Sequence, residues 1–586
     1  MQYPKIPLAQ TVIQLCKAKN IQNIVISPGS RNAPLVIGFT NDDFFNCYSI
    51  VDERCAAFFA LGMAQQQQLP TALVCTSGSA LLNYYPAIAE AFYSDIPLLV
   101  LSADRSEYLI GIGDGQTINQ SNVYKNHILY SASLKQNLEN IPKNANDDEP
   151  AIIKSIENKL ERFLGIKQQI KEENEEEINM AINTALIKKG PVHINVPFEE
   201  PLYELTDKLS EKPKSVEIDV KPKKLDSVEL EACLDDWNDA SKKMILVGVN
   251  TPNAIDQKWL DELANDNSVI VLTETTSNIH HKEFFPNIDK IIAPLGDEEF
   301  KLLQPDILLT FGGMIVSKKV KAFLRKYKPK QHWHVDKKKA NDTFFCLERH
   351  IEFSPNQFFS EFLPKLTHVK KSEYKPFWKQ IKQQRQERHL KYLDEIKFSD
   401  FKVFDAVLKA IPKNVSLQVG NSSAIRYTQL FNLKKSIDVY CNRGTSGIDG
   451  CTSTAIGFAS KNTKQTVFIT GDLSFFYDSN ALWNNYIPQN FRIILINNGG
   501  GGIFRILPGN KNSENFDTYF ETKHNLTAKH LSEMYGFEYF SVSNESDLQQ
   551  QLDTFFDRSK KPKLIEIFTP RTINDEVLLT YFDYIK

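Results

Sequence analysis

The chain has 586 residues, of which 42% are hydrophobic and 24% charged, as in ordinary globular proteins. Its 69 Lys and Arg residues nearly balance 72 Asp and Glu residues, and the formal net charge of −3 argues against a broad basic surface for nucleic acid. The eight cysteines are scattered without a C-x-x-C pair, which is typical of a reduced cytoplasmic protein. No secretory signal pattern and no apolar run of about 18 residues is present, so we expect no membrane span.

Short apolar runs recur along the chain, and each is followed by a polar turn and a helix-like pattern. In chain order the runs are NIVISPGS, TALVCTSGSA, PLLVLSADR, PVHINVPF, MILVGVN, VIVLTET, ILLTFGG, HWHVD, SLQVGNSS, VYCNRGTSG, TVFITGD, RIILINNGGGG and KLIEIFTP. Nearly continuous apolar strands that alternate with helices predict parallel sheets covered on both faces. Such sheets bind ligands at the carboxyl ends of their strands, which is where the polar turns fall.

The pattern predicts an α/β chain of three doubly wound, mainly parallel-sheet domains, at residues 1–198, 225–368 and 398–586. Two linkers separate them. Residues 199–224 are rich in charge and proline, and residues 369–397 form a charged connector that we expect to be a solvated helix.

The first turn that suggests a binding site lies in IVISPGSRNAPL, Ile24 to Leu35, where the sequence predicts a buried strand, then a turn and then a helix. This order predicts that Ser30 and Arg31 lie at the carboxyl edge of the sheet, beside a helix N-terminus that favours anions. The planar guanidinium of Arg31 can present two donors to a carboxylate. A single arginine is more often part of a surface ion pair. Arg31 therefore indicates an anion site only if other arginines are also found at strand ends.

The strongest chemical signal runs from Gly471 to Gly502, in GDLSFFYDSNALWNNYIPQNFRIILINNGGGG. One apolar strand ends at Asp472 and the next ends at Asn498, so both side chains are expected at the same sheet edge. A carboxylate, an amide oxygen and a backbone carbonyl suit a hard divalent cation that also binds phosphate oxygens. The glycines allow close approach of the backbone to a diphosphate. Each of the two turns by itself is most simply explained as a structural turn without a ligand. The pair, at the ends of two strands, is typical of a thiamine diphosphate (ThDP) site.

A ThDP site requires a second carboxylate, which lies after a strand of the first domain and activates the aminopyrimidine ring of the cofactor. The stretch CYSIVDERCAAFFALGMA places Glu53 at such a position, at the start of a small-residue helix. Acidic residues are common at helix starts because they interact favourably with the helix dipole, so Glu53 by itself is weak evidence.

Taken together, the chain resembles the 2-succinyl-5-enolpyruvyl-6-hydroxy-3-cyclohexene-1-carboxylate synthase family, the ThDP enzymes of menaquinone biosynthesis. The resemblance rests on ISPGSRNAPL, DERCAAFFALGMA, TSGSA, GDGQ, GPVHINVPFEEPLY, VGNSSAIR, NRGTSGIDG, GDLSFFYD and NNGGGGIF, which span all three domains. It implies a pyrimidine-binding first domain, a central domain and a diphosphate-binding third domain, within the architecture of ThDP-dependent enzymes.

The resemblance also implies residue roles. Glu53 would activate the cofactor, Asp472, Asn498 and the Gly500 carbonyl would bind Mg²⁺ or Mn²⁺, and Ile448 would be the apolar wedge that bends the cofactor. The remaining cofactor-binding residues would be Arg443, Gly471, Leu473, Ser474, Ile503 and Phe504, with Leu507 lining the reaction pocket. The acidic substrates would be bound by Ser30, Arg31, Arg105, Gln116, Lys318, Ser422, Arg426 and Arg443.

Two positions depart from the family pattern. Lys319 stands where relatives often carry an arginine, and it keeps the charge but not the planar fork. Gly115 stands where some relatives carry an asparagine, which removes one possible substrate contact.

The activity implied is decarboxylation of 2-oxoglutarate on ThDP and addition of the succinyl carbanion to isochorismate, with release of CO₂. Each substrate is a dianion, so the pocket must offset about four negative charges, and four arginines with two lysines would supply them. The cofactor is expected between the first domain of one chain and the third of another, which implies a homodimer or a dimer of dimers. Another ThDP carboligase or 2-oxo acid decarboxylase remains an alternative, as does a non-catalytic α/β ligand-binding protein.

Overall fold

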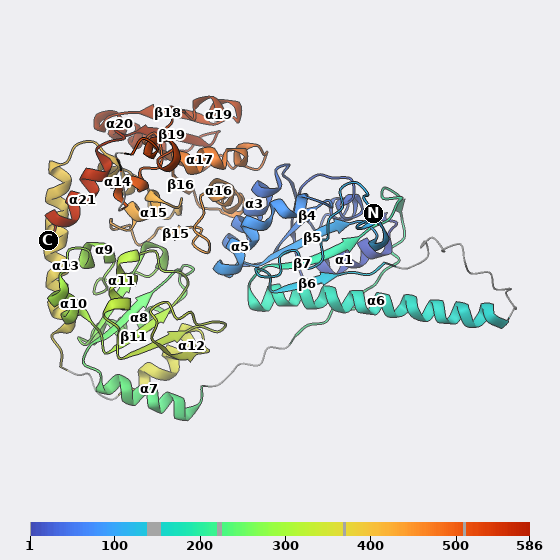
Figure 1. Cartoon of the computed structure of the whole chain (residues 1–586), viewed down its shortest axis with the longest axis horizontal. Coiled ribbons are helices and arrows are strands. Elements are labelled where there is room, and N and C mark those ends of the chain that lie inside the picture. The colour runs from blue at the N-terminus through green and yellow to red at the C-terminus, as the bar shows by residue number, and fades with distance from the viewer. Residues whose placement is uncertain (1, 137–153, 219–224, 367–370, 508–510, 512) are drawn as a thin grey trace. The chain divides into compact units, whose positions relative to one another are not determined.

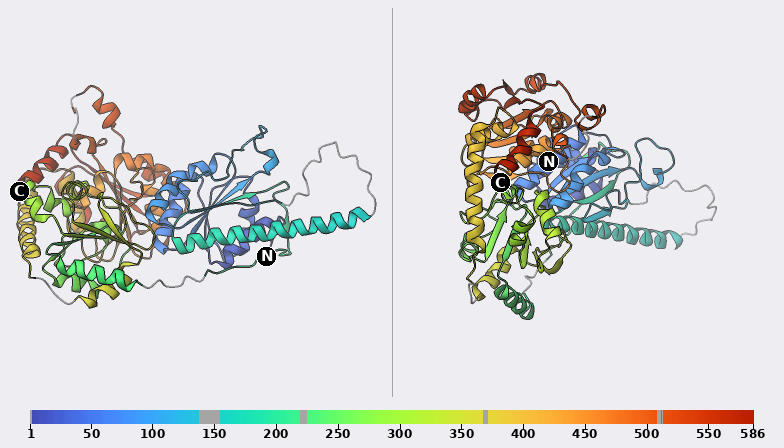
Figure 2. Two further views of the ribbon diagram at one scale, coloured as in Figure 1. Left: turned by 60° about the horizontal axis from the view of Figure 1, so that its bottom comes forward. Right: turned by 60° about the vertical axis from the view of Figure 1, so that its left-hand side comes forward.

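The computed structural model describes residues 2–136, 154–218, 225–366, 371–507, 511 and 513–586. Three parallel sheets form its framework, and helices flank each of them (Figures 1 and 2). The predicted fold class, an α/β chain built on three mainly parallel sheets, is therefore confirmed.

The N-terminal sheet has six parallel strands in the order β3-β2-β4-β5-β7-β6. Its strands are β2 (Asn23–Ile26), β3 (Asn46–Ser49), β4 (Thr71–Cys75), β5 (Leu98–Asp104), β6 (Tyr130–Ser133) and β7 (Val192–Pro197). Its helices are α1 (Pro7–Ala18), α2 (Ala33–Thr40), α3 (Glu53–Gln67), α4 (Ala80–Asn83), α5 (Tyr85–Ser94) and α6 (Lys154–Lys188), of which α6 runs beside β6 and β7. A short antiparallel pair joins β1 (Tyr3–Pro4) to β8 (Leu205–Thr206).

The central sheet has five parallel strands in the order β10-β9-β11-β12-β13. These are β9 (Lys243–Val247), β10 (Val269–Thr273), β11 (Ile307–Phe311), β12 (Gln331–Val335) and β13 (Leu347–Ile351). The accompanying helices are α7 (Ser227–Asp239), α8 (Gln257–Asn265), α9 (Ile288–Ile292), α10 (Asp297–Leu303), α11 (Lys318–Lys326) and α12 (Pro355–Phe362). A single 3₁₀ turn, η2 (Thr275–Ser277), follows β10.

The C-terminal sheet has six parallel strands in the order β15-β14-β16-β17-β19-β18. They are β14 (Ser416–Val419), β15 (Asp438–Tyr440), β16 (Thr466–Gly471), β17 (Phe491–Asn497), β18 (Glu538–Val542) and β19 (Lys563–Phe568). Its helices are α14 (Asp400–Ala410), α15 (Ser423–Thr428), α16 (Cys451–Lys461), α17 (Asp472–Tyr477), α18 (Ile503–Ile506), α19 (Lys529–Met534), α20 (Glu545–Phe555) and α21 (Asn574–Tyr584).

The chain divides into two compact units that do not follow the order of the sheets. The first unit holds residues 1–220 together with 452–462 and 480–487, and the second holds the rest, including the central and C-terminal sheets. Helix α16 belongs to the first unit through close backbone packing on α3. A Cβ at Gly62 would lie 2.0 Å from the Thr454 carbonyl oxygen, and one at Gly457 would lie 1.9 Å from that of Phe59. The two glycines thus allow the helices to touch.

The predicted connector helix is α13 (Tyr374–Glu395), which packs on α9, α21 and β10 within the second unit (Figure 1). The prediction of a helix is confirmed, but the expectation of a solvated helix is wrong along one face. Tyr374, Trp378, His389 and Leu393 are buried there. Tyr374 donates a hydrogen bond to the Leu303 carbonyl oxygen at 2.6 Å, so the helix braces this unit and is not a free linker.

The central strands of each sheet match the predicted apolar runs, whereas the edge strands β6, β13 and β18 were missed. These edge strands carry partly exposed residues, so their sequences lack a continuous apolar pattern. Within the described part of the chain, none of the helices combines the length and apolar character needed to cross a membrane.

Candidate active site

Asp472 begins α17 directly after β16, and its carboxylate holds the glycine loop that follows β17. Its Oδ2 accepts the backbone N–H groups of Gly499 and Gly500 at 2.9 and 3.0 Å. Gly500 has a φ of 152°, and a Cβ there would lie 2.7 Å from the Glu521 carbonyl oxygen, so a side chain does not fit. Two of the three predicted metal ligands, Asp472 and Gly500, are therefore brought together at one sheet edge.

The third predicted ligand, Asn498, is oriented by a buried carboxylate. Its Nδ2 donates to Asp400 Oδ2 at 2.9 Å, and Asp400 Oδ1 accepts the Thr569 hydroxyl at 2.5 Å. Burial raises the pKa of Asp400 to about 6. With the Asn498 amino group engaged, its amide oxygen is the atom left to act as a ligand. An amide oxygen, one carboxylate and a carbonyl fit a hard divalent cation whose other ligands are water and phosphate.

The described residues contain no group of three His, Cys, Asp or Glu side chains arranged to hold a metal. The predicted set contains only one such side chain, Asp472, because its other members are an amide and a carbonyl. It therefore depends on phosphate oxygens to complete the metal coordination.

The other predicted cofactor residues surround this edge. Gly471 ends β16, and the backbone N–H of Leu473 donates to Asp472 Oδ1 at 2.7 Å. The Ser474 hydroxyl donates to the carbonyl oxygen of Ile448 at 3.1 Å, which ties α17 to the loop that follows β15. Ile503 and Phe504 begin α18, where Phe504 is 38% exposed and so is free to line a pocket.

Arg443 and the loop that carries Ile448 are fixed by one buried amide, Asn421. Its Oδ1 accepts the Arg443 Nη1–H at 2.8 Å, and its Nδ2 donates to the carbonyl oxygens of Asn442 and Gly447, each at 2.7 Å. Asn421 is 2% exposed. A single side chain at the end of β14 therefore holds the end of β15 and positions a predicted substrate cation.

Arg426 and Ser422 are neighbours, although not in the way the sequence suggested. Helix α15 begins at Ser423, and Ser422 precedes it with a φ of 66°, so the expected pairing of both side chains on one helical face is wrong. The Arg426 Nη1–H donates instead to the Ser422 backbone carbonyl at 2.8 Å. Burial lowers the pKa of Arg426 and the nearby Arg443 lowers it further, whereas the carboxylate of Asp289 raises it.

A cavity of about 150 Å³ lies where α11, α15 and α21 meet in the second unit. Lys318, Lys319 and Arg426 all line it, together with the carboxylates of Glu274 and Asp289. The Lys319 ammonium lies 4.8 Å from the centre of the Phe582 ring, a cation–π contact. The predicted central-domain lysines therefore share a cavity with a predicted cation of the C-terminal domain.

In the first unit, Arg31 and Arg105 lie at neighbouring strand ends. Arg31 follows β2, is 7% exposed, and pairs with Glu200 at 3.3 Å. Its pKa is lowered by burial and then by the nearby Arg105. Arg105 follows β5 and donates to the carbonyl oxygen of Gly115 at 2.8 Å. Both arginines are thus at the predicted edge, where Arg31 pairs with a carboxylate and Arg105 bonds a backbone carbonyl oxygen.

Ser30 and Gln116 are exposed at the same edge. Gln116 follows Gly115 with a φ of 55°, so its side chain projects from a loop and not from regular structure. Ser30 directly precedes Arg31, and Gln116 follows Gly115, whose carbonyl oxygen accepts the hydrogen bond of Arg105.

Glu53 is the first residue of α3 and follows the strand β3, as the sequence predicted. The preceding residue, Asp52, caps the helix by accepting the Cys55 N–H at 3.1 Å, and it accepts the Asn480 amide at 2.8 Å. Glu53 itself accepts a hydrogen bond from Asn83 at 3.3 Å. Because Asp52 provides the cap, the Glu53 carboxylate is left to contact a ligand.

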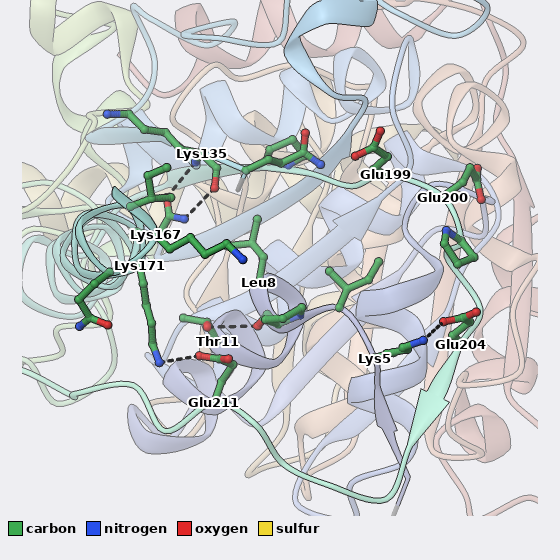
Figure 3. Close-up of a pocket in the computed structure, with 18 residues that line it drawn as sticks. Lys5, Leu8, Thr11, Lys135, Lys167, Lys171, Glu199, Glu200, Glu204 and Glu211 are labelled. Carbon is green, nitrogen blue, oxygen red and sulfur yellow. Dashed lines mark hydrogen bonds and ion pairs between the residues drawn. The ribbon is translucent and has the colours of Figure 1, made fainter. Parts of the chain in front are cut away.

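A larger cavity of about 690 Å³ in the first unit is a separate feature (Figure 3). Of the charged residues that line it, Lys5 pairs with Glu204 at 2.6 Å and Lys171 with Glu211 at 2.8 Å. Lys135 donates to Glu173 at 2.7 Å. None of the predicted site residues lines this cavity, and its paired charges leave little unbalanced potential to bind an anion.

Sequence reasoning missed Asp400, Asn421, His524 and Glu274. His524 lies on a loop with its Nε2 3.3 Å from Asp472 Oδ2, and the others are buried polar residues whose partners come from distant segments. The only sequence signal for Asn421 and Glu274 was their place directly after predicted strands. No local pattern distinguishes such residues from ordinary turn residues.

Three family models match the chain in order. The thiamine pyrophosphate enzyme N-terminal TPP binding domain matches residues 6–123, the middle domain of thiamine pyrophosphate enzymes matches 213–419, and the C-terminal TPP binding domain matches 419–567. Thiamine pyrophosphate is another name for ThDP. The chain thus has the three domains of a thiamine pyrophosphate enzyme.

Curated relatives are similar over nearly the whole chain. A 2-succinyl-5-enolpyruvyl-6-hydroxy-3-cyclohexene-1-carboxylate synthase of Flavobacterium psychrophilum is 56% identical over 99% of both chains. The enzyme of the same name from Christiangramia forsetii is 57% identical over 100% of both, and that of Porphyromonas gingivalis is 35% identical over 98% of this chain and 96% of its own. The chain belongs to the 2-succinyl-5-enolpyruvyl-6-hydroxy-3-cyclohexene-1-carboxylate synthase family of thiamine pyrophosphate enzymes.

Proposed function

We propose that this chain decarboxylates 2-oxoglutarate and adds the resulting succinyl unit to isochorismate, which gives 2-succinyl-5-enolpyruvyl-6-hydroxy-3-cyclohexene-1-carboxylate and CO₂ in menaquinone biosynthesis. The observation that carries the proposal is the match in name and length of the relatives, together with cations gathered at strand ends. A carboligase for small, singly charged substrates has no need for Lys318, Lys319 and Arg426 around one cavity.

When bound, ThDP supplies the carbon nucleophile and the electron sink for decarboxylation. The chain would bind and orient it. Glu53 would hold a proton at a nitrogen of the pyrimidine ring, and the arginines would hold the substrate carboxylates in position. Asp472, Asn498 and the Gly500 carbonyl would hold Mg²⁺ or Mn²⁺ against the diphosphate.

The cellular compartment and the oligomeric state of the enzyme are also part of the proposal. We expect the enzyme to act in the cytoplasm, in keeping with its eight scattered cysteines, which include no C-x-x-C pair. We also expect a homodimer or a dimer of dimers, which light scattering on the purified protein with and without ThDP tests. A strictly monomeric, fully active protein would contradict this expectation.

The test of the proposed function is product formation from 2-oxoglutarate and isochorismate in the presence of ThDP and Mg²⁺. We expect equal amounts of CO₂ and of the succinylated product, identified by mass spectrometry. Omission of isochorismate should stop formation of that product. Turnover of pyruvate in preference to 2-oxoglutarate would favour a different ThDP carboligase, and absence of ThDP binding would favour a ligand-binding protein.

The two lysines of α11 are expected to differ in importance. Lys318→Ala should lower kcat/KM for isochorismate about ten- to a hundredfold, the usual cost of losing a charge-assisted hydrogen bond. Lys319→Ala should have a smaller effect, because the Lys319 ammonium already packs on the Phe582 ring at 4.8 Å. Steady-state kinetics of both variants make the comparison. Negligible losses in both would remove the central domain from the substrate site.

Arg426 is expected to recognise the distal carboxylate of 2-oxoglutarate. Arg426→Ala should lower kcat/KM for 2-oxoglutarate about ten- to a hundredfold. Any weak turnover of pyruvate, which lacks that carboxylate, should fall much less. Arg388→Ala, on the exposed face of α13, is the control for loss of an arginine. Equal losses with both 2-oxo acids would mean that Arg426 acts on the fold, the cofactor or the second substrate.

A further inference from the structure

A short turn follows β10, and its residues form hydrogen bonds with elements outside the central sheet. We call residues 274–278 the β10 turn; it comprises Glu274, η2 and Asn278. Glu274 is 4% exposed, and Thr276 and Ser277 are fully buried. None of these residues belongs to the sets predicted from the sequence, so their burial requires a separate explanation.

The first contact of the β10 turn is with the start of α11. The two carboxylate oxygens of Glu274 accept the backbone N–H groups of Val316 and Ser317, each at 2.7 Å. Ser317 is the N-cap of α11, and Lys318 and Lys319 are its first two residues. Glu274 therefore fixes the position from which both lysines project.

The second and third contacts are with a helix and a strand of the C-terminal domain, α15 and β15. The Thr275 N–H donates to the Gln429 side-chain oxygen at 3.0 Å, and Gln429 ends the helix that carries Arg426. Asn278 forms two hydrogen bonds with Val439 of β15. Its Nδ2 donates to the Val439 carbonyl oxygen at 2.9 Å, and its Oδ1 accepts the Val439 N–H at 2.8 Å. Strand β15 leads directly to Arg443.

The β10 turn is itself anchored to the central sheet. The Ser277 hydroxyl donates to the Val247 carbonyl oxygen at the end of β9 at 2.8 Å, and it accepts the Glu274 N–H at 3.0 Å. Asn278 Nδ2 also donates to the Asn250 carbonyl at 2.8 Å. One rigid turn is thus bonded to each of the three elements that carry Lys318, Arg426 and Arg443.

We propose that the β10 turn is a positioning element that sets the spacing of these three cations, with Glu274 holding the α11 lysines and Asn278 holding the Arg443 loop. The inference rests on the proposed function for the identity of the anion. Carboxylate recognition by several cations requires their spacing to hold within about 0.5 Å. A turn that bonds all three elements provides that constraint through its hydrogen bonds to the protein backbone and to Gln429.

Glu274→Gln tests the contact with α11. An amide has one acceptor where the carboxylate has two, so one of the N–H groups of Val316 and Ser317 loses its partner. We expect faster hydrogen–deuterium exchange across residues 316–321, measured by mass spectrometry. We also expect kcat/KM for 2-oxoglutarate to fall about ten- to a hundredfold, mainly through KM, and turnover of pyruvate to fall much less.

Asp306→Ala is the control for loss of a carboxylate that accepts backbone N–H groups, because an asparagine oxygen at this position could keep both contacts. Asp306 Oδ2 also accepts two backbone N–H groups, from Ser241 and Lys242 at 3.0 Å each, in the same domain. It precedes β11 and so lies at the opposite edge of the central sheet. If the substitutions only weaken the central domain, kcat/KM should fall equally in both variants, and it should fall alike for 2-oxoglutarate and pyruvate. That result would overturn the proposal.

Asn278→Asp provides an independent test should Glu274→Gln fold poorly. It keeps the acceptor for the Val439 N–H but replaces the donor to the Val439 carbonyl with an oxygen. Exchange should rise at 438–443 and not at 316–321. Unchanged exchange in both variants would refute the positioning role whatever the activity. Faster exchange at the expected segments, in an enzyme that proves inactive towards the proposed substrates, would support the positioning role and refute the proposed function instead.

Discussion

Glu53→Gln is expected to remove most of the catalytic turnover while leaving ThDP bound. The amide keeps the shape of the side chain and can still form hydrogen bonds, but it cannot take up and return a proton at the pyrimidine ring. The helix start should survive, because Asp52 and not Glu53 caps α3. The exchange rate of the C2 proton of bound ThDP, followed by NMR after acid quench, reports the effect directly and should fall by orders of magnitude.

Glu545→Gln is the matched control for this substitution. Glu545 is likewise the first residue of a helix, α20, and it pairs with Lys402 at 3.4 Å. The control variant should exchange the C2 proton and turn over substrate at the wild-type rate. A wild-type exchange rate in Glu53→Gln would refute the role of Glu53 as the activating acid.

Asp472→Ala is expected to abolish metal-dependent binding of ThDP. It removes the only carboxylate of the proposed metal site, and in the proposal the metal would hold the diphosphate to the protein. It also removes the acceptor of the Gly499 and Gly500 N–H groups, so the free energy of unfolding should fall by about 1–3 kcal/mol. Calorimetric titration of ThDP with Mg²⁺ measures the affinity, and thermal melting without ligand measures the stability.

Asn498→Ala separates the two effects of the preceding substitution. It removes the proposed amide ligand and its hydrogen bond to Asp400 but leaves the contact of Asp472 with the glycine loop intact, so we expect weak ThDP binding while that loop stays in place. Asp297→Ala, at the exposed first position of α10, controls for loss of a helix-start aspartate. Unchanged ThDP affinity in both site variants would rule out the metal-site assignment.

Much of the proposed site could be read from local sequence because its residues occupy strand ends. Apolar runs mark the buried strands, and the residue after each run must lie at the carboxyl edge of a parallel sheet. Ser30, Arg31, Asp472 and Asn498 were predicted in this way, whereas Glu53 was predicted because a ThDP site requires a second carboxylate. Where the prediction depended on the geometry of a turn, it was less reliable: Ser422 lies outside α15 with a positive φ, so its side chain does not share a helical face with Arg426.

Residues that hold the site in place were not predictable. Glu274, Asn421 and Asp400 are buried, and each bonds to segments far away in the chain. Their partners depend on how the sheets and loops are assembled, so no local pattern reveals them. The same holds for α16, which packs on α3 through Gly62 and Gly457.

The sequence by itself determined the α/β class, the central strands of each sheet and the chemical type of the site, because burial and strand-end position are encoded in hydrophobic periodicity and turn residues. Only the tertiary structure decided which polar residues support those ligands. It placed Lys318, Lys319 and Arg426 around one cavity and joined their elements through the β10 turn. The physical reason is that a buried hydrogen bond needs both partners, and the second partner comes from a segment that only folding brings near.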